Sequence, residues 1–350
     1  MKQIFFITPN LANGGAEHIT ALLANGLAQR GKHVVVLCMK DHKRVFPLDS
    51  SVPIVSLFDA RGGIGKIPRK VLRLRRMMKQ YPEATFVAML PYETLYTFLA
   101  SIGLRRRMVY SLRNDPAHMK GLLHWFIWNA VYPTAHCVVF QTEEACHFFP
   151  DRVREKGVVI PNPIETNLPR RFTEERRHEV VTVGRLTRQK NIPMLLRAFA
   201  QVHAAHTDWT LKIYGEGPLR AELEQLREQL GLTEAVSFCG FVDHVAEQIN
   251  QSGMFVLAST YEGISNAMLE ALATGVPCIC TDCPAGGARM MIQSGENGIL
   301  VPVNGERELA DAMLALIEHP ELAERYSRAA VRRCASLSEQ NILEQWEQVL

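Results

Sequence analysis

The most informative part of the sequence is residues 255–277, which read FVLASTYEGISNAMLEALATGVP. The run Phe255–Ala258 is apolar, as expected of a strand buried on both faces of a parallel sheet. A turn containing Glu262 follows, and a helix is predicted to start near Ser265. The first amides of such a helix are unpaired and carry the positive end of its dipole, so they favour phosphate oxygens. Glu270 lies one turn inside this helix among apolar and small residues, so its carboxylate is expected to need a partner such as a sugar diol.

The same alternation of short apolar strands and helical stretches runs through the chain. It pauses at Pro161-Asn162-Pro163, where proline fixes φ and removes a backbone donor, and this extended segment is the predicted hinge between two domains. Each half contains several strand–helix–strand units, which predicts an α/β protein with two doubly wound, Rossmann-like domains. The predicted strands are Ile4–Thr8, Val34–Met39, Phe86–Leu90, Met108–Ser111, Val138–Gln141, Val180–Val183, Leu211–Tyr214, Val236–Cys239, Phe255–Ala258, Val276–Thr281 and Gly298–Pro302. The predicted helices include Ala16–Gln29, one capped by Asn191 that ends near Ala205, Leu219–Leu230 and Ser338–Leu350.

Length and composition limit the class of protein. The chain has 350 residues, which suggests two domains at about 100–200 residues each. With 47% hydrophobic and 21% charged residues, it has the composition of an ordinary globular protein. The run Ile4–Ile7 is too short for a signal peptide, and no stretch has the roughly 18 uncharged apolar residues of a membrane-spanning helix. Eight scattered cysteines do not indicate a disulfide framework, so we expect a soluble intracellular protein.

Charge is distributed unequally along the chain. Residues 1–165 contain 22 Lys and Arg against 12 Asp and Glu, whereas the remainder contains 17 against 24. Three interpretations of the basic excess stay open: a nucleic-acid partner, for which no zinc-finger spacing or RNA-binding signature is present, an anionic membrane surface, or a solvated helix face. The excess is concentrated in Arg69, Lys70, Arg73, Arg75, Arg76 and Lys79, and then in Arg105, Arg106 and Arg107.

Two further segments carry residues suited to a phosphorylated ligand. Arg185 follows a predicted strand, and Lys190 comes five residues later, just before a helix; a guanidinium and an ammonium in that position suit a diphosphate. Gly14 and Gly15 follow the first strand, where a backbone without Cβ can approach a ligand closely. This glycine loop fits neither the dinucleotide-binding nor the Walker pattern. Taken alone, each segment also fits an ordinary turn or protein surface.

The sequence lacks the usual ligands for a metal ion. No Asp-x-Asp occurs, so the carboxylate pair that holds Mg²⁺ or Mn²⁺ against a nucleotide diphosphate in many transferases is missing. Cys278 and Cys280 alternate within an apolar run with no histidine close by, which favours a buried strand over a zinc site. We therefore expect no cofactor and no metal.

A series of short motifs extends over most of the chain. Glu262 and Glu270 form a Glu-x₇-Glu motif, followed by Ala-Thr-Gly-Val-Pro. The others are Gly14-Gly15-Ala16-Glu17, Gln141-Thr142-Glu143, Val159–Pro163, Val183–Leu186, Lys190-Asn191, Gly215–Pro218, Phe238-x-Gly240 and Gly295–Pro302. In this order and spacing, the chain resembles the retaining glycosyltransferases of family 4, which have the GT-B fold.

This resemblance implies a role for each candidate residue. Two cations would hold the diphosphate of a nucleotide-sugar donor, helix-start amides would contact the phosphate or sugar, and two glutamates would bind sugar hydroxyls and the ribose diol. The residues implied for catalysis are Arg185, Lys190 and Glu262. Those implied for donor binding are Gly14, Gly15, Gly263, Ile264, Ser265, Asn266 and Glu270.

The resemblance also implies an organisation and an activity. Two Rossmann-like domains would face each other across a cleft, with residues 1–165 on the acceptor side, 166–336 on the donor side, and 337–350 a helix crossing back to the first domain. The enzyme would move a hexose or N-acetylhexosamine, without a metal and with retention, from a UDP-linked donor to a hydroxyl of a polyprenyl-diphosphate-linked glycan. It would serve bacterial surface polysaccharide synthesis, in the cytoplasm and in peripheral contact with the anionic inner face of the membrane, with no nucleic-acid partner.

One stretch of the first half departs from the family pattern, and another fits two different environments. Many family members carry a histidine after a mid-domain strand, but His118 is in a different register, so no role is transferred to it; Arg113 and Asn114 are expected on the acceptor side. The helix predicted over Leu122–Tyr132 fits either packing on the sheet or insertion into a membrane interface.

Two other classes of protein fit part of the sequence. An NAD-dependent oxidoreductase would also have Rossmann-like halves, but its glycine fingerprint is absent. A non-catalytic sugar-nucleotide-binding protein would bind the donor without releasing UDP.

Overall fold

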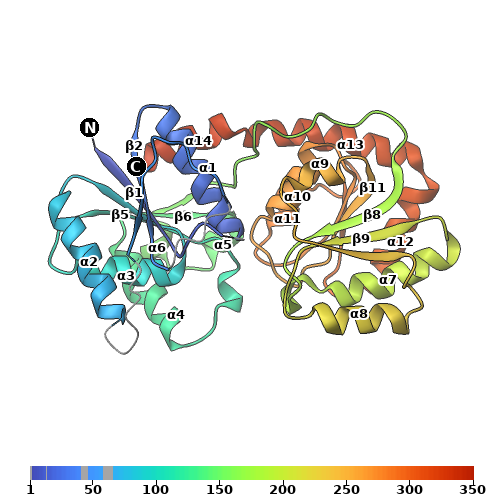
Figure 1. Cartoon of the computed structure of the whole chain (residues 1–350), viewed down its shortest axis with the longest axis horizontal. Coiled ribbons are helices and arrows are strands. Elements are labelled where there is room, and N and C mark those ends of the chain that lie inside the picture. Colours follow the sequence, from blue (N-terminus) through green and yellow to red (C-terminus); the bar gives the residue numbers. More distant parts are fainter. Residues whose placement is uncertain (1, 13, 41–45, 58–65) are drawn as a thin grey trace. The chain divides into compact units, whose positions relative to one another are not determined.

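The computed structural model describes residues 2–12, 14–40, 46–57 and 66–350. Residue contacts divide the chain into two compact units. Unit 1 contains residues 1–163 together with 339–350, and unit 2 contains residues 164–338 (Figure 1). The last helix, α14 (Glu339–Val349), therefore belongs to unit 1 although it follows unit 2 in the chain.

Unit 1 is built around a seven-stranded sheet in the order β3-β2-β1-β4-β5-β6-β7, in which every pairing is parallel. The chain begins in the middle and adds strands first on one side and then on the other, so the sheet is doubly wound, as predicted. The strands are β1 (Gln3–Thr8), β2 (His33–Cys38), β3 (Ile54–Ser56), β4 (Thr85–Ala88), β5 (Arg107–Ser111), β6 (Cys137–Phe140) and β7 (Gly157–Val159). The α-helices before unit 2 are α1 (Gly15–Gln29), α2 (Lys66–Gln80), α3 (Pro91–Ser101), α4 (Leu122–Phe126), α5 (Glu143–His147) and α6 (Asp151–Arg154).

Helix α14 completes the core of unit 1. Trp346 is fully buried, and its ring centroid lies 6.3 Å from that of Phe6 in β1. A Cβ atom on Gly26 of α1 would lie 2.5 Å from the side chain of Leu343, so glycine is what permits this close approach between α1 and α14. The last helix is thus part of the packed interior of unit 1.

Unit 2 contains a six-stranded parallel sheet in the order β10-β9-β8-β11-β12-β13. The chain leaves β8 toward one edge and continues from β11 toward the other, so the carboxyl ends of β8 and β11 are neighbours at the point where the direction of winding changes. In doubly wound sheets, ligands bind outside the strands at this point. The strands are β8 (Arg177–Val183), β9 (Thr210–Tyr214), β10 (Val236–Gly240), β11 (Ser252–Leu257), β12 (Cys278–Thr281) and β13 (Ile299–Val301). The α-helices are α7 (Ile192–Ala205), α8 (Arg220–Gln229), α9 (Val245–Ile249), α10 (Asn266–Ala273), α11 (Gly287–Met291), α12 (Glu306–Glu318) and α13 (Pro320–Cys334).

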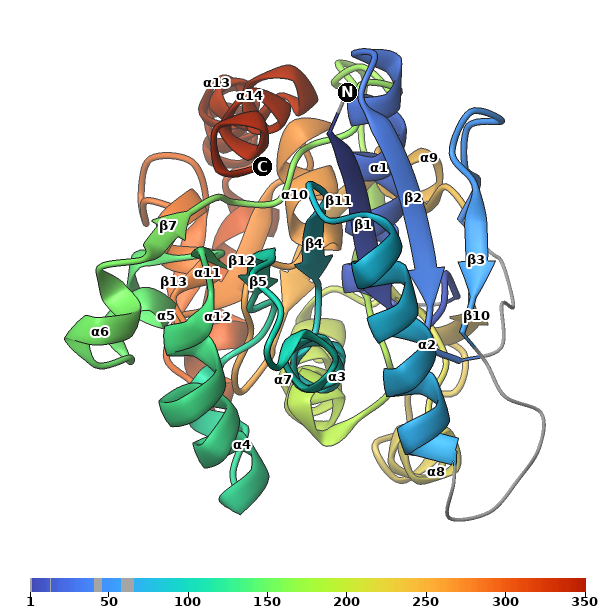
Figure 2. The ribbon, with the colours of Figure 1, turned by 90° about the vertical axis from the view of Figure 1, so that its left-hand side faces the viewer.

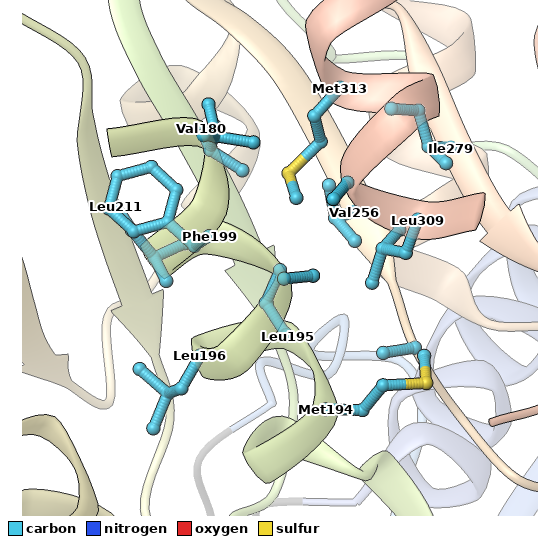
Figure 3. Packing of buried hydrophobic residues seen from close by; sticks show 14 of the residues in the cluster. Val180, Met194, Leu195, Leu196, Phe199, Leu211, Val256, Ile279, Leu309 and Met313 are labelled. Atoms are coloured by element: carbon cyan, nitrogen blue, oxygen red, sulfur yellow. The ribbon is translucent and has the colours of Figure 1, made fainter. Parts of the chain in front are cut away.

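The core of unit 2 lies between the sheet and helices α7 and α12. Figure 3 shows Leu195 and Phe199 of α7 and Leu309 of α12 together with Val256 of β11. All four side chains are buried. This continuous apolar contact fixes the strands, and with them the loops at their carboxyl ends.

The structure differs from the sequence predictions in a few elements. Predicted strands agree with observed strands to within about three residues, but β3 and β7, which have three residues each and lie at the two edges of their sheet, were not predicted. Asn191 precedes α7 without capping it. Its backbone is left-handed (φ 48°), and its side-chain amide donates to Oδ1 of Asn304 at 3.2 Å.

The helix predicted over Leu122–Tyr132 is divided. Helix α4 ends at Phe126 and has no buried residue, and a π-helical turn over Ile127–Val131 follows. Ile127, Val131 and Tyr132 are fully buried. The prediction that this segment packs on the sheet is therefore confirmed for residues 127–132 and wrong for α4.

Candidate functional site

The loop after β8 is held close to the turn after β9. The amide of Gly184 donates to the carbonyl oxygen of Tyr214 at 2.9 Å, and that of Leu186 donates to the oxygen of Glu216 at 2.9 Å. Gly215 has φ +128°, and a Cβ atom there would lie 2.0 Å from the oxygen of Gly184, so no other residue fits. These contacts fix the backbone on both sides of Arg185.

Arg185 itself is exposed. Within the described part of the chain, its guanidinium has no hydrogen-bond or ion-pair partner. A guanidinium held by a rigid loop, with its five donors directed to water, is suited to an anionic ligand.

Lys190 and Glu262, two of the residues predicted for catalysis, are in direct contact. Nζ of Lys190 lies 2.5 Å from Oε2 of Glu262, and only 14% and 16% of the two side chains are exposed. The hydroxyl of Ser259 donates to the same carboxylate oxygen at 3.2 Å. A Cβ atom on Gly184 would lie 2.9 Å from Cε of Lys190, so the lysine side chain passes directly over that glycine. The loops after β8 and β11 therefore meet in a sheltered ion pair.

The position of Glu262 is set by its backbone neighbours. Its amide donates to Pro284 at 2.6 Å, and its carbonyl accepts from the amide of Ala285 at 2.9 Å. On the other side, Gln189 accepts a hydrogen bond from the amide of Thr260 at 2.8 Å and donates its own side-chain amide to the oxygen of Tyr261 at 3.0 Å. The loop after β11 is thus tied to the loops after β8 and β12.

A glycine allows the loop after β11 to approach the loop after β12 closely. A Cβ atom on Gly287 would lie 1.8 Å from the carbonyl oxygen of Gly263. Gln189, Ser259 and Gly287 were not singled out from the sequence, because none of them belongs to a motif. Gln189 could have been found from its position between Arg185 and Lys190 in the sequence.

Helix α10 begins where the sequence predicted. Ser265 is its N-cap, and its hydroxyl accepts a hydrogen bond from the amide of Met268 at 3.4 Å. Ile264 and Ser265 are buried, whereas Asn266 and Glu270 are half-buried. Gly263–Asn266 therefore continue directly from the ion-paired Glu262 into the positive end of a helix.

Gly14 and Gly15 lie in unit 1, directly before α1 and at its first residue. A Cβ atom on Gly14 would lie 1.9 Å from Oε2 of Glu17, so that carboxylate reaches back over the glycine to the helix start, where negative charge is favourable. The contact of these two glycines with a donor stays a prediction.

The structure shows what surrounds Arg113. Its Nη1 donates to Oδ1 of Asn162 at 2.9 Å, and its guanidinium lies 5.5 Å from the ring centroid of Trp346. Nε and Nη2 are shielded from water and have no partner among the described residues, and this burial lowers the pKa of Arg113 to about 9. Arg113 therefore contributes to the packing of α14, and its place on the acceptor side stays a prediction.

A histidine and an aspartate pair just beyond β5. Nδ1 of His118 is 2.6 Å from Oδ2 of Asp115. The aspartate is buried, whereas 41% of the histidine side chain is exposed. The buried carboxylate therefore fixes the orientation of an accessible imidazole, and the Asp-x-x-His spacing was the signal for this pair.

The cysteines predicted to lie in a buried strand do so. Cys278 and Cys280 are fully buried in β12, and burial raises the pKa of both thiols. Among the residues that the structure describes, no three His, Cys, Asp or Glu side chains are grouped so that they could hold a metal ion. In the same part of the chain, no helix has the length and apolar character needed to cross a membrane.

The sequence of both units matches models of glycosyltransferase families. Residues 13–168 match the family model described as Glycosyltransferase Family 4, and residues 177–319 match that of Glycosyl transferases group 1. The chain therefore belongs to this family of glycosyltransferases, as its motifs predicted, and the oxidoreductase interpretation is set aside.

Individual relatives are similar to this chain over its full length. An α-1,4-N-acetyl-D-galactosaminyltransferase of Campylobacter jejuni, named for a GalNAc-GalNAc-diNAcBac-PP-undecaprenol substrate, is 25% identical and covers 99% of this chain and 97% of its own. The amylovoran biosynthesis glycosyltransferase AmsD of Erwinia amylovora is 22% identical, with both chains fully covered. The crystal structure of HepE from Anabaena with UDP and glucose is 20% identical, covers 99% of both chains and superposes with a TM-score of 0.86. The predicted GT-B fold is thus confirmed.

Proposed function

We propose that this enzyme transfers a hexose or N-acetylhexosamine from a UDP-linked donor to a hydroxyl of a polyprenyl-diphosphate-linked glycan, with retention of configuration. Its role would lie in bacterial surface polysaccharide synthesis, at the cytoplasmic face of the membrane. The undecaprenol-linked substrate in the name of the Campylobacter relative and the UDP bound by HepE support this choice of acceptor and donor.

The observation that carries the proposal is the cation arrangement at the switch point of unit 2. Arg185 is exposed on a rigid loop, and Lys190 lies beside the segment that leads into α10. The donor diphosphate gains negative charge as its bond to the sugar breaks. Fixed cations and helix-start amides aimed at that charge lower the barrier, because they need no reorganisation during the reaction.

The remaining residues would orient the donor. Glu262 holds Lys190 in place and, once the diphosphate engages that lysine, can accept hydrogen bonds from the sugar hydroxyls. Gly263, Ile264, Ser265 and Asn266 would present backbone groups to the phosphate or sugar. Glu270, further along the helix, would bind the ribose diol.

The proposed chemistry needs neither a metal ion nor a protein nucleophile. The acceptor oxygen attacks the anomeric carbon on the face from which the diphosphate leaves. The bond between that carbon and the phosphate oxygen breaks, its electron pair goes to the phosphate oxygen, and this oxygen takes the acceptor proton. The products are the extended glycan with unchanged configuration and UDP.

A transfer assay tests the proposal. The enzyme is incubated with UDP-glucose, UDP-galactose or their N-acetylamino counterparts and with a polyprenyl-diphosphate-linked saccharide. We expect UDP release to match glycan extension for one donor, and NMR of the product to show the anomeric configuration of the donor. Inversion would refute the same-face mechanism, and UDP binding without release with any such acceptor would indicate a non-catalytic protein.

A further inference from the structure

Helix α3 has an outward face without any charge. Its one charged residue, Glu93, is buried at 3% exposure. The side chains that reach the surface are apolar or aromatic, with Tyr92 at 52% exposure and Leu95 and Leu99 half-buried one and two turns further on. A helix at a water-exposed surface normally places charged or polar residues on this face.

The neighbouring helix α4 is more apolar still. It consists of Leu122, Leu123, His124, Trp125 and Phe126, and none of these five residues is buried. Leu122 is 82% exposed and Trp125 is 59% exposed. Single exposed apolar residues are ordinary, but four large ones in one turn of helix are not.

The two helices form one surface. The rings of Phe98 in α3 and Phe126 in α4 are 6.5 Å apart, and those of Tyr92 and His124 are 6.2 Å apart. Figure 2 shows α2, α3 and α4 following one another along one side of the sheet of unit 1, and α2 packs against α3. We call this surface the α3–α4 face; Tyr92, Leu95, Leu99, Leu122, Trp125 and Phe126 represent it.

The residues around the α3–α4 face are strongly basic. Residues 66–136 contain twelve Lys and Arg but only three Asp and Glu. Some charges of both signs do not reach the surface: Lys70 and most of the Arg113 guanidinium are buried, as are Glu93 and Asp115. Glu83 is the one exposed acid among the three. Arg76 and Lys79 are exposed on α2, and α2 contains no acidic residue. Apolar and aromatic side chains bordered by cations match the two layers of an anionic lipid surface, acyl chains and phosphate head groups.

We propose that the α3–α4 face inserts into the surface of an anionic phospholipid bilayer, with Leu122, Trp125 and Phe126 entering the interface and the cations of α2 contacting the head groups. This inference rests on the proposed function for its purpose, because it would bring unit 1 to the layer that holds a lipid-linked acceptor. Its test uses no substrate, so its failure is distinct from failure of the transfer assay.

The experiment is cosedimentation of the full chain with vesicles of phosphatidylcholine alone or mixed with phosphatidylglycerol. We expect binding to the anionic vesicles and a blue shift of Trp125 emission as that ring leaves water. The double change Leu122→Ser with Trp125→Ser should reduce binding at least ~10-fold. Arg76→Glu with Lys79→Glu should reduce binding to the anionic vesicles by ~10-fold or more, with little effect on neutral ones.

Phe241→Ser is the matched control, because Phe241 is 49% exposed but lies in unit 2. Its vesicle binding should equal that of the unaltered chain. The melting temperature should be the same in all variants, which excludes misfolding as the cause of any loss. Equal vesicle binding by the Leu122/Trp125 variant would overturn the proposal. So would a lipid-free dimer that this variant makes monomeric, since the face would then join two copies.

Discussion

The two cations predicted to hold the donor diphosphate differ in what they bind without it. Lys190 is sheltered and paired with Glu262 at 2.5 Å, whereas Arg185 is exposed on its loop. A bound diphosphate can engage Arg185 at once, but it must share Lys190 with a carboxylate. Because both partners of the pair are largely shielded from water, removing one leaves the other poorly compensated. Loss of Lys190 should therefore affect stability as well as catalysis.

Arg185→Ala and Lys190→Ala should each lower turnover by at least ~100-fold, the scale associated with loss of one preorganised charge donor. Turnover is measured as UDP release at saturating donor and acceptor. Arg188→Ala is the control, because Arg188 is an exposed cation in the same loop with no predicted role. Full activity of the first two variants would remove their proposed roles. A lower melting temperature is expected for Lys190→Ala but not for Arg185→Ala.

Glu93 should make the folding stability of unit 1 depend on pH. Burial raises its pKa from 4.5 to about 7. Between these values the unfolded chain has lost the proton that the folded chain keeps, so stability falls as pH rises and the loss is complete above about 7. A shift of this size corresponds to about 3 kcal/mol.

Glu93→Gln should remove this part of the pH dependence, with Glu83→Gln, an exposed acid of the same unit, as the control. Urea unfolding is followed by tryptophan fluorescence between pH 5 and 8. Three of the four tryptophans lie in unit 1, so the signal reports mainly on that unit. Parallel curves for Glu93→Gln and the unaltered chain would contradict this assignment.

Among the elements, those with a long or strongly apolar pattern could be predicted from the sequence. Strands such as β1, β8 and β11 are apolar runs bounded by turns, and the start of α10 follows from the order strand, turn, helix. Edge strands β3 and β7 are too short to produce a pattern. The division of the segment after Gly121 also has no local signal, because its apolar residues fit a continuous helix.

The candidate site was predictable in its residues but not in its contacts. The motifs placed Lys190 and Glu262 at the ends of two strands, yet nothing in the sequence showed that the two side chains pair. That contact depends on the register of β8 against β11 and on the close approach allowed by Gly184 and Gly287. The surroundings of Arg113 could not be predicted for a similar reason, since they include Trp346 of α14, more than two hundred residues later in the sequence.

Helix α14 should be essential to unit 1. Trp346→Ala removes a fully buried ring that packs against β1, a change that typically costs about 3–5 kcal/mol. Hydrogen exchange should accelerate in β1 and α1, while exchange in the strands of unit 2 stays unchanged. Trp209→Ala, in unit 2, should give the opposite pattern. Equal acceleration in both units by Trp346→Ala would show that they unfold together.

For the whole molecule, nucleotide binding is the most direct measurement. Melting temperatures are compared with UDP, GDP, ADP and NAD, with and without EDTA. UDP at about a hundred times its dissociation constant should stabilise the protein by about 2.7 kcal/mol, and NAD should have no effect. Because Arg185, Lys190 and α10 are proposed to take the place of a metal ion, EDTA should not change the shift with UDP. Loss of that shift in EDTA would refute the metal-free proposal.

Synthesis of the chain from its N-terminus finishes unit 2 before unit 1, because α14 is made after every element of unit 2. All strands and helices of unit 2 lie in one continuous segment that ends at Ser338. A nascent chain stalled at that point carries a complete second unit, while the surface of the first that Trp346 and Leu343 later cover, around Phe6 and Gly26, is still open. Most of unit 1 is therefore translated before unit 2, but its core can be completed only after unit 2 has been made.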